Sequence, residues 1–574
     1  MKTLLINVPI RNCGTDFPPY GILSIMQSVR KHGVSEIDFL NIDQKRLQYQ
    51  QVVEYIKDAK PDILGISCVV STSYKYLKDL SLDIKKNLPE TLIVIGGNMA
   101  AAGEVLLHKT GVDLCVTGEG ERTLCNIIEK YKKNQTNSLD GYDEIPGLLF
   151  LKGDEVVNTG YEQEIKPDEI YEIDWRDLEN SSDINHYIVP FKSNKGVASI
   201  ALWGHDPRLE QPHRQSKNVT TLISSKGCVA KCTFCHRWAK GIRFIPVDLL
   251  IVRIKDLIEK YDIGFLSFGD ENFGANKRWL GEFCSKIKAL DILWAVGGMR
   301  ANSASIEEVQ MMKQAGCCSV QYGMESGSDR ILNIMEKKIS VEQNKRAIDI
   351  IVESDLYTTC QLVLGMPGES PESIKETIEF AKYISTRSAK HNLHNIAIFY
   401  AQALPGTPLY EFGRHNNLIA QGIDGEDEYL LSISNVNAAD SSNTINFTDY
   451  PALIWKYWSV LIQINANYVF VKRNGLDLYN QRMEEKSSLP IYNRYPVAAF
   501  KLRHFLVIAS LLVTFKRNGI KTAFEQSIEY LKYFLFGKKR SFKHEYRSLR
   551  KIVKEELGPV PSDKPSMFPL RLGR

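Results

Sequence analysis

Short runs of aliphatic and β-branched residues alternate with amphipathic stretches over the first 135 residues. The runs have the length of β-strands, and the stretches between them repeat apolar residues at helical spacing. Such alternation predicts βαβ units, and hence an α/β, doubly wound, Rossmann-like domain whose parallel sheet is covered on both faces. The predicted strands are residues 4–8, 37–41, 63–67, 92–95 and 114–117, and the predicted helices lie near residues 23–31, 52–59, 76–86 and 121–131.

A second region with the same alternation extends from about residue 219 to 415. It contains six apolar runs, separated by helical patterns such as residues 249–261 and 374–385. Six βα units are too few for a closed eight-stranded barrel, so we expect an open, partial (β/α)6 barrel of the TIM type. Its predicted strands are residues 220–224, 265–268, 293–297, 319–323, 358–365 and 395–400.

The remaining segments have other patterns. Residues 136–218 are rich in Asn, Asp, Ser and Gly, which indicates a connecting segment, with a small hairpin predicted at residues 153–154. From about residue 445 the pattern is helical and aromatic. The chain is therefore expected to have a Rossmann-like domain (1–135), a connecting segment (136–218), a barrel (219–415) and an α-helical C-terminal region (416–574).

The bulk composition favours an ordinary folded protein. Of the 574 residues 44% are hydrophobic and 24% charged, which is not the composition of a disordered chain. The net charge of +4 gives no support for a nucleic-acid partner. The first apolar run is too short for a signal peptide, and no segment offers the ~20 apolar residues of a spanning helix. We therefore expect a cytoplasmic protein.

Three of the eleven cysteines are clustered, and they carry the strongest chemical signal. The other eight are scattered and are interpreted as buried small hydrophobic residues. Cys228, Cys232 and Cys235 have the spacing C-x3-C-x2-C just after the first predicted barrel strand. Three thiolates so close can hold three irons of a 4Fe–4S cluster and leave the fourth iron open for catalysis. Zinc is the alternative, but His236 adjoins Cys235 and is poorly placed as a fourth ligand.

This triplet resembles the signature of the radical-SAM superfamily, in which an aromatic residue, here Phe234, precedes the third cysteine. The resemblance extends to segments that close four later strands of the predicted barrel, where barrel enzymes build their sites. The segments are 268–273, 323–328, 365–369 and 403–408. The resemblance implies that the open iron chelates the methionine part of S-adenosylmethionine (SAM).

The same resemblance implies roles for individual residues. Gly269, Asp270 and Glu271 look like the short acidic motif that meets the SAM amino group, while Glu325 and Ser326 are similar to the segment lining its ribose. Arg300 could pair with the SAM carboxylate, the alternative being a solvated charge at the barrel rim. Gly365 belongs to the segment after the fifth strand. Glu369 and His236 are interpreted as a turn carboxylate and a surface residue.

The first domain resembles the cobalamin-binding domain that precedes the barrel in one large radical-SAM subfamily. Its motifs follow the predicted strands, where glycines let the backbone approach a bulky ligand. The alternative is that glycine follows strands in any doubly wound sheet. Residues 43–48 lack the histidine and glycine of the D-x-H-x-x-G motif, so the lower cobalt ligand is unassigned. The predicted cofactor-binding residues are Ser67, Gly96, Gly97, Gly118, Glu119 and Gly120.

The C-terminal region has no motif of known chemistry, but it is basic. Residues 538–574 contain eleven Lys or Arg and four Asp or Glu, and residues 505–515 form an apolar run flanked by basic residues. The favoured interpretation is a helical layer packed on the barrel with a solvated basic rim. The alternative is peripheral contact with an anionic membrane surface, which would suit a lipid-linked substrate. The flanking basic residues are Lys501, Arg503, Lys516 and Arg517, followed by residues 538–540.

Taken together, the resemblances imply a radical-SAM enzyme with a 4Fe–4S cluster, SAM and cobalamin that transfers a methyl group to an unactivated carbon of an unknown organic substrate. An electron donor such as flavodoxin or ferredoxin is expected to reduce the cluster. The alternatives are an oxidative or cyclising reaction with the same cofactors, a non-catalytic cobalamin or metal sensor, and a zinc-stabilised binding protein.

Overall fold

The computed structural model describes residues 1–537 with the exception of short internal segments. The predicted basic tract at 538–540, and the rest of the tail to residue 574, lie outside the described residues. The internal exceptions are residues 11–13, 194–197, 199–202, 205, 237, 240, 304, 390–395, 437, 440–443, 484–485 and 488.

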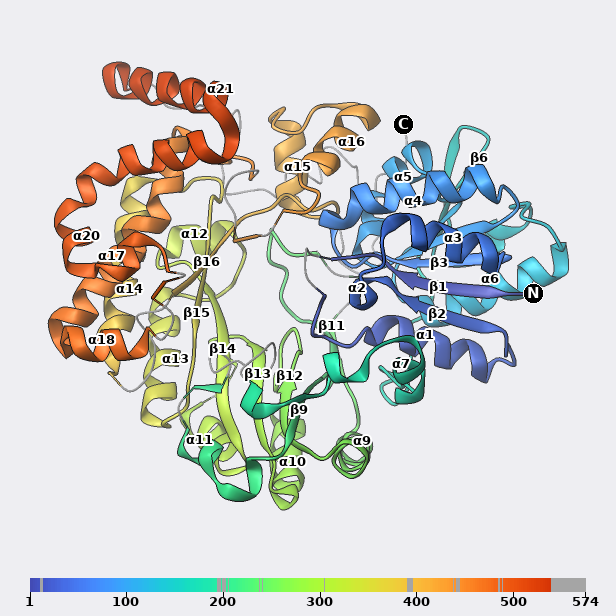
Figure 1. Ribbon diagram of the computed structural model, residues 1–574, viewed down its shortest axis with the longest axis horizontal. Helices are drawn as coiled ribbons and strands as arrows, with labels where there is room; N and C mark the ends of the chain where they lie inside the picture. Colours follow the sequence, from blue (N-terminus) through green and yellow to red (C-terminus); the bar gives the residue numbers. More distant parts are fainter. Residues whose placement is uncertain are drawn as a thin grey trace.

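The predicted Rossmann-like sheet is present near the N-terminus (Figure 1). Its strand order is β2-β1-β3-β4-β5-β6-β7, and the first five strands are parallel. Apolar residues on one face pack against α1 (Tyr20–Lys31) and α6 (Gly120–Asn134). The opposite face packs against α3 (Tyr49–Ala59), α4 (Tyr74–Asn87) and α5 (Gly103–Lys109). The parallel strands are β1 Thr3–Asn7, β2 Ile37–Asn41, β3 Ile63–Ser67, β4 Leu92–Gly96 and β5 Leu114–Val116.

Residues 136–218 do more than connect the two sheets. The predicted hairpin forms as β6 (Leu148–Lys152) and β7 (Glu155–Asn158), and it extends the first sheet by pairing antiparallel with β5. Further along, the short strand β8 (Val189–Pro190) pairs antiparallel with the first strand of the second sheet. One segment therefore supplies edge strands to both sheets, because its short alternating runs complete hydrogen bonding at exposed edges.

The second sheet is the predicted open barrel, with six parallel strands in the order β16-β15-β14-β13-β12-β9 and β8 beside β9. Helices between the strands cover its outer surface (Figure 1). The parallel strands are β9 Asn218–Leu222, β12 Ile263–Phe268, β13 Leu293–Met299, β14 Cys317–Glu325, β15 Cys360–Leu364 and β16 Ile396–Tyr400. The outer helices are α9 Val247–Tyr261, α10 Lys277–Ile287, α11 Ile306–Gln314, α12 Asp329–Ile334, α13 Val341–Glu353 and α14 Pro371–Arg387.

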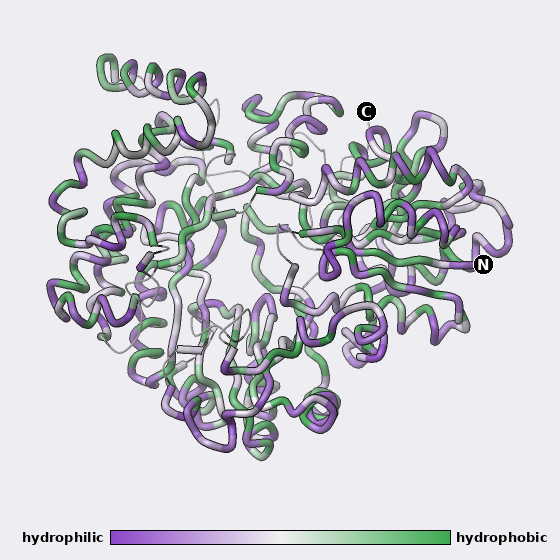
Figure 2. Tube along the Cα trace, viewed as in Figure 1, coloured by the Kyte–Doolittle hydropathy of each residue, from purple (hydrophilic) through white to green (hydrophobic). Residues whose placement is uncertain are grey.

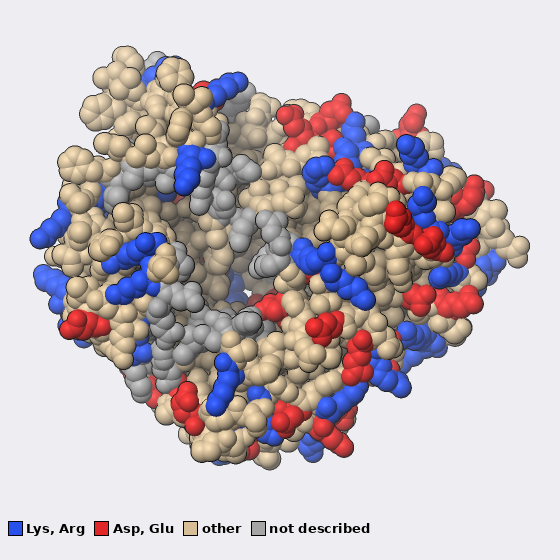
Figure 3. Space-filling view, in the orientation of Figure 1, with Lys and Arg blue, Asp and Glu red and all other residues tan. Residues whose placement is uncertain are grey.

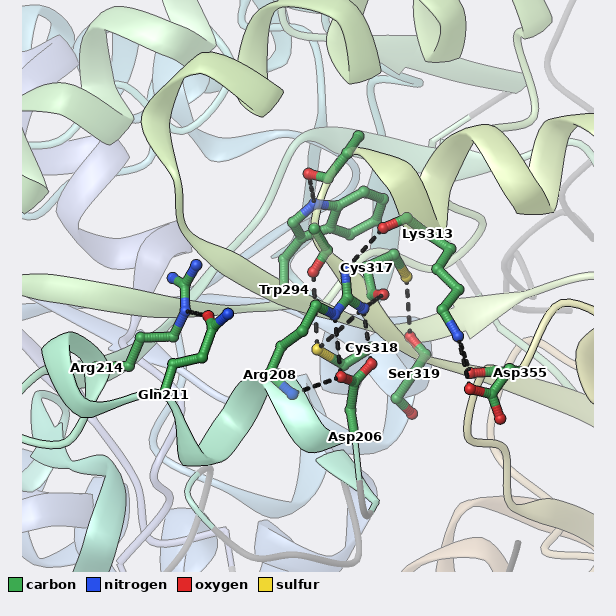
Figure 4. Close-up of polar contacts among 12 residues, drawn as sticks. Asp206, Arg208, Gln211, Arg214, Trp294, Lys313, Cys317, Cys318, Ser319 and Asp355 are labelled. Carbon is green, nitrogen blue, oxygen red and sulfur yellow. Dashed lines mark hydrogen bonds and ion pairs between the residues drawn. The ribbon is translucent and has the colours of Figure 1, made fainter. Parts of the chain in front are cut away.

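A polar network that the sequence did not reveal closes the amino-terminal end of this barrel (Figure 4). Arg208 donates to the carbonyl oxygens of Lys313 at 2.8 Å and Cys317 at 2.6 Å, and it pairs with Asp206 at 2.7 Å. Trp294 donates from Nε1 to the Ala315 carbonyl at 2.8 Å. These contacts satisfy the carbonyl groups where α11 ends and β14 begins, and they leave the carboxyl end of the barrel available for chemistry.

The C-terminal region is helical, as its pattern predicted. Helix α17 (Ala452–Asn474) packs against α14, and the long helix α21 (Leu506–Phe536) packs in turn against α17. Within the part of the chain that the structure describes, no helix is long and apolar enough to cross a membrane. The other helices of this region are α15 Pro408–His415, α16 Gly422–Ser432, α18 Leu476–Arg482, α19 Ile491–Arg494 and α20 Pro496–Leu502.

Candidate active site

The three clustered cysteines lie on a hairpin that stands at the carboxyl end of the barrel, the first at the end of a strand and the other two in the loop. Its strands, β10 (Ser225–Cys228) and β11 (Gly241–Phe244), pair antiparallel, and Cys228 lies opposite Gly241. Gly227 has φ +90°, and a Cβ there would come within 2.5 Å of the Gly241 carbonyl oxygen. This position therefore requires glycine immediately before the first cysteine.

Thr233 anchors the cysteine loop to the rest of the molecule. Its backbone N–H donates to the Met335 carbonyl at 2.9 Å, and its hydroxyl donates to the Ile334 carbonyl at 3.0 Å. Its own carbonyl accepts from the Leu409 N–H at 3.1 Å. Phe234, predicted beside the third cysteine, is partly buried against the neighbouring core. No local sequence pattern indicates this role of Thr233, because all its partners are distant along the chain.

Cys228 and Cys232 are buried and Cys235 is exposed. Among the residues that the structure describes, no three His, Cys, Asp or Glu side chains are gathered into a metal-binding group. The chemistry of the donors nevertheless fits an iron–sulfur cluster, because three thiols share one short loop whose two ends are fixed by strand pairing. His236 is half-buried, with its ring 4.9 Å from the Trp238 ring in an edge-on contact.

The two carboxylates of the acidic segment after β12, Asp270 and Glu271, lie in different environments. Asp270 is buried and accepts hydrogen bonds from the Ser224 hydroxyl at 2.9 Å and the Ser224 N–H at 3.1 Å, and also from the Ser225 hydroxyl. Burial raises the pKa of Asp270 to about 6, against the lowering effect of these bonds. Its carboxylate thus braces the turn between β9 and β10, next to Gly269. Glu271 instead lines the cavity described below.

Asn272, in the same segment, was not singled out from the sequence. Its side chain is completely buried, and neither its amide nitrogen nor its amide oxygen has a hydrogen-bond partner among the described residues. A buried amide without partners costs free energy, which indicates a place where a ligand can complete its hydrogen bonds.

The predicted ribose-binding segment ends β14 in a strained, charged turn. Glu325 has φ +61°, and its carboxylate accepts from Lys337 Nζ at 2.5 Å in a buried ion pair. Arg300 donates to the Lys337 carbonyl oxygen. The Ser326 hydroxyl lies 3.4 Å from that of Thr377. The structure therefore brings Arg300 and Glu325 together through Lys337, which the sequence did not reveal.

At the end of β15, Glu369 is buried and accepts from the Gly365 N–H at 2.6 Å. Burial raises the pKa of Glu369 to about 8. The interpretation of Glu369 as a turn carboxylate agrees with this contact. Gly365 has φ +88° and lies against the Trp455 ring, so α17 reaches the carboxyl end of the barrel strands.

A cavity of about 310 Å³, partly open to solvent, lies at the carboxyl edge of the first sheet. It continues along one sheet face between α1 and α6, where Leu5, Gly65 and Val94 are aligned across neighbouring strands. A Cβ added at Gly96 would meet nothing within 4 Å, so this edge is open to a bulky ligand. The lining includes every residue predicted to hold cobalamin: Ser67, Gly96, Gly97, Gly118, Glu119 and Gly120.

The other wall of this cavity belongs to the barrel region. Lys226 and Gly227 precede the first clustered cysteine, Trp238 and Ala239 follow the third, and all four line the cavity. Trp238 donates from Nε1 to the Gly97 carbonyl at 3.1 Å, which joins the two walls directly. Arg300, Glu325, Ser326 and Gly365 are not in the lining. The cavity thus connects the strand-end glycines with both flanks of the cysteine loop.

A buried ion network fixes this junction. Lys226 Nζ lies 3.2 Å from carboxylate oxygens of both Glu119 and Glu121, and Arg243 pairs with Glu119 from the opposite strand of the hairpin. Arg243 also lies 3.3 Å from Glu164. Burial alone would raise the pKa of Glu119, but Lys226 and Arg243 hold it below its usual value. The network therefore ties the first sheet to the hairpin as charged groups.

Comparisons with known proteins agree with this geometry. Residues 6–128 match the B12 binding domain family and residues 222–381 match the radical SAM superfamily. An uncharacterized methyltransferase of Pyrococcus horikoshii is 28% identical over 433 residues, which is 73% of this chain and 84% of that protein. The anaerobic magnesium-protoporphyrin IX monomethyl ester cyclase of Cereibacter sphaeroides is 23% identical over 64% of this chain, and the match spans only 56% of the cyclase.

Among solved structures, the fold is similar to that of the cobalamin-dependent S-adenosylmethionine radical enzyme OxsB with aqua-cobalamin bound. The TM-score is 0.54 at 15% identity, with 93% of this chain and 75% of that chain covered. The prediction of a Rossmann-like domain followed by an open barrel is thereby confirmed. The chain therefore carries a B12-binding domain at residues 6–128 ahead of a radical SAM domain at residues 222–381.

Proposed function

We propose that this radical SAM enzyme is a cobalamin-dependent methyltransferase that acts on an unactivated carbon of an organic substrate. The observation that carries the proposal is the shared cavity, because residues of the B12-binding domain and both flanks of the cysteine loop line it together. When bound, the cluster supplies the electron for SAM cleavage and cobalamin carries the methyl group. A methyltransferase among the relatives supports this choice.

The chain's own residues have defined tasks in this proposal. Cys228, Cys232 and Cys235 would ligate the cluster, and the Thr233 anchor would hold their loop in place. The Glu325 carboxylate, held in place by its ion pair with Lys337, would accept hydrogen bonds from hydroxyl groups of SAM. Arg300 adds positive charge near the same turn. Asp270 would act indirectly, by bracing the turn that leads into the cysteine hairpin.

In the B12-binding domain, the strand-end glycines would admit the corrin ring close to the backbone. The apolar slot beside Leu5, Gly65 and Val94 offers room for an apolar extension of the cofactor. No histidine is in the cavity lining, so the cobalt would receive no imidazole from the described lining residues. An external one-electron donor of the flavodoxin or ferredoxin type and an organic substrate complete the proposal.

The second candidate is a cyclising or oxidative reaction with the same cofactors, favoured by the similarity to the protoporphyrin ester cyclase. The two candidates share the site, so the products must separate them: methyl transfer consumes a second SAM as methyl donor and releases S-adenosylhomocysteine, whereas cyclisation does not.

The test is anaerobic reconstitution with iron, sulfide and hydroxocobalamin, followed by SAM and dithionite. We expect about four irons per chain, retained cobalamin and formation of 5′-deoxyadenosine. Cys232→Ala should abolish 5′-deoxyadenosine, whereas Cys284→Ala, a buried cysteine on α10, should not. Equal 5′-deoxyadenosine from both variants would contradict the cluster assignment. Activity without cobalamin retention would contradict the methyltransferase.

A further inference from the structure

The long C-terminal helix α21 exposes apolar side chains to solvent. Ten of the twenty exposed large apolar side chains among the described residues lie on this one helix. Figure 2 shows hydrophobic residues recurring along its protruding part, and Figure 3 shows a mostly uncharged surface there with Lys and Arg near its edges. Exposed apolar residues in such number are unusual for a soluble surface and mark an interaction site.

These side chains form stripes at helical spacing. Before the kink at Gly519 (φ +82°), Ile508, Leu512 and Phe515 follow one another by four and three residues. After the kink, the exposed residues recur by four, four, three and four residues, and so share one face. They are Ile520, Phe524, Ile528, Leu531 and Leu535.

The opposite side of α21 already contacts the protein. Thr514 and Ala523 are buried, the Tyr533 ring lies 5.9 Å from the Tyr450 ring, and Glu529 accepts from the Ala452 N–H at 3.3 Å. A helix that covers a barrel normally turns its apolar face inward. Among the described side chains of α21, Phe524 and Leu531 are instead exposed on the side away from these contacts, so this outer face is available for a partner.

The charge of the chain indicates the chemistry of that partner. Residues 501–574 contain seventeen Lys or Arg and six Asp or Glu, a net charge of +11. Since the whole chain carries +4, residues 1–500 carry −7. Lys516, Lys521 and Lys532 are exposed on α21 itself. In the sequence, positive charge is thus concentrated in the C-terminal 74 residues, which include α21, and is absent, on balance, from residues 1–500.

We propose that the outward face of α21 docks on a bilayer surface that contains anionic phospholipids. Its apolar stripes would insert among the acyl chains near the headgroups while the lysines contact lipid phosphates. The helix lies in the plane of the surface, consistent with the finding that no described helix could span a bilayer. Since α21 packs against the start of α17, which reaches Gly365 through Trp455, the docked face is linked to the carboxyl end of the barrel.

The proposal does not depend on the reaction, and binding is measured with the full-length protein without substrate. The assay is co-sedimentation with vesicles of equal parts phosphatidylcholine and phosphatidylglycerol, compared with phosphatidylcholine alone. We expect binding to the anionic vesicles, at least about tenfold weaker binding to neutral ones, and weakening by added salt.

Two triple variants separate the contributions. Leu512→Ser with Phe524→Ser and Leu531→Ser should weaken partitioning at least about tenfold, since three apolar side chains no longer leave water. The matched control replaces by Ser three apolar side chains that are also exposed but lie on other helices, and it should bind as the wild type. They are Tyr55, Leu82 and Val252. Changing Lys516, Lys521 and Lys532 to Glu should abolish the preference for anionic vesicles.

Three results would overturn the proposal. The first is no binding of the wild type to the anionic vesicles. The second is equal binding by the Leu512, Phe524, Leu531 triple variant and the control variant. The third is a wild-type dimer, seen by light scattering, that this triple variant converts to a monomer without any vesicle binding by the wild type, which would assign the face to a second copy of the chain.

Discussion

Glu119 is the carboxylate through which the B12-binding domain holds the cysteine hairpin, and we expect Glu119→Gln to weaken that junction. At the observed 3.2 Å, the Lys226–Glu119 pair has a Coulomb attraction of about 5 kcal/mol at an effective dielectric constant of about 20. Much of this attraction offsets the cost of burying both charges. Removing one partner from a buried pair typically costs about 3–5 kcal/mol. Because Glu121 still faces Lys226 and Glu164 still faces Arg243, we expect a loss of about 3 kcal/mol.

The assay is urea-induced unfolding followed by tryptophan fluorescence, in a cycle with Lys226→Met and the double variant. If the two residues act as a pair, the losses of unfolding free energy in the two single variants should add up to more than the loss in the double variant. The expected difference is at least about 1 kcal/mol. The folded-state pKa of Glu119 is lower than its unfolded value, so its stabilisation is complete above the ordinary value of 4.5 and disappears as the pH falls through the depressed one. Two results together would refute a coupled pair: a loss of unfolding free energy below about 0.5 kcal/mol for Glu119→Gln, and additive losses for Glu119→Gln and Lys226→Met.

Three further substitutions test other parts of the site. Gly96→Leu should fill the open edge of the cavity and prevent cobalamin retention. The control Gly281→Leu on α10, where an added side chain also meets open space, should retain cobalamin. Equal absorbance of bound cobalamin in the two variants would contradict the assignment of this edge. Asn272→Leu should leave the unfolding free energy equal or up to about 1 kcal/mol higher, because a buried amide without partners is removed. If that amide binds a ligand, the same variant should form 5′-deoxyadenosine at least tenfold more slowly. Unchanged 5′-deoxyadenosine formation would show that Asn272 has a purely structural role. For Glu369 the folded pKa of about 8 exceeds the unfolded one, so its own contribution to stability is complete below pH 4.5 and is lost as the pH rises toward 8. Glu369→Gln should remove this contribution, so the wild type and the variant should differ in the slope of melting temperature against pH between 4.5 and 8; equal slopes would be evidence against it.

Much of the architecture could be predicted because the spacing of apolar residues along the chain indicates where strands and helices form. The runs at residues 37–41 and 63–67 are strands with those same bounds, since a buried parallel strand needs a continuous apolar run. The order of strand-end motifs also predicted which residues would share the cavity. The hairpin that carries the cysteines could not be predicted this way. Its strand Ser-Lys-Gly-Cys has no apolar alternation, and strand pairing and ion pairs with the first domain hold it instead.

Contacts between distant segments account for the other differences. Asp270 was predicted at the SAM amino group from its motif, and the structure places its carboxylate on Ser224 and Ser225. Residues 136–218 were predicted to connect the domains and to contain a small hairpin, but their pairing with both sheets was not predicted. Whether a strand pairs at the edge of a sheet depends on which neighbouring strand has free backbone hydrogen-bonding groups there. The local sequence of the added strand does not indicate this.

The cavity wall formed by Lys226, Gly227, Trp238 and Ala239 has a consequence for how the enzyme matures. These residues flank the cysteine loop on both sides, so a large cofactor seated in the cavity covers the approach to the thiols from that side. Iron and sulfide are therefore expected to be installed before cobalamin. A cell that makes this protein under iron limitation would then accumulate a form preloaded with cobalamin that is slow to activate, and supply of the metal would set the timing of assembly.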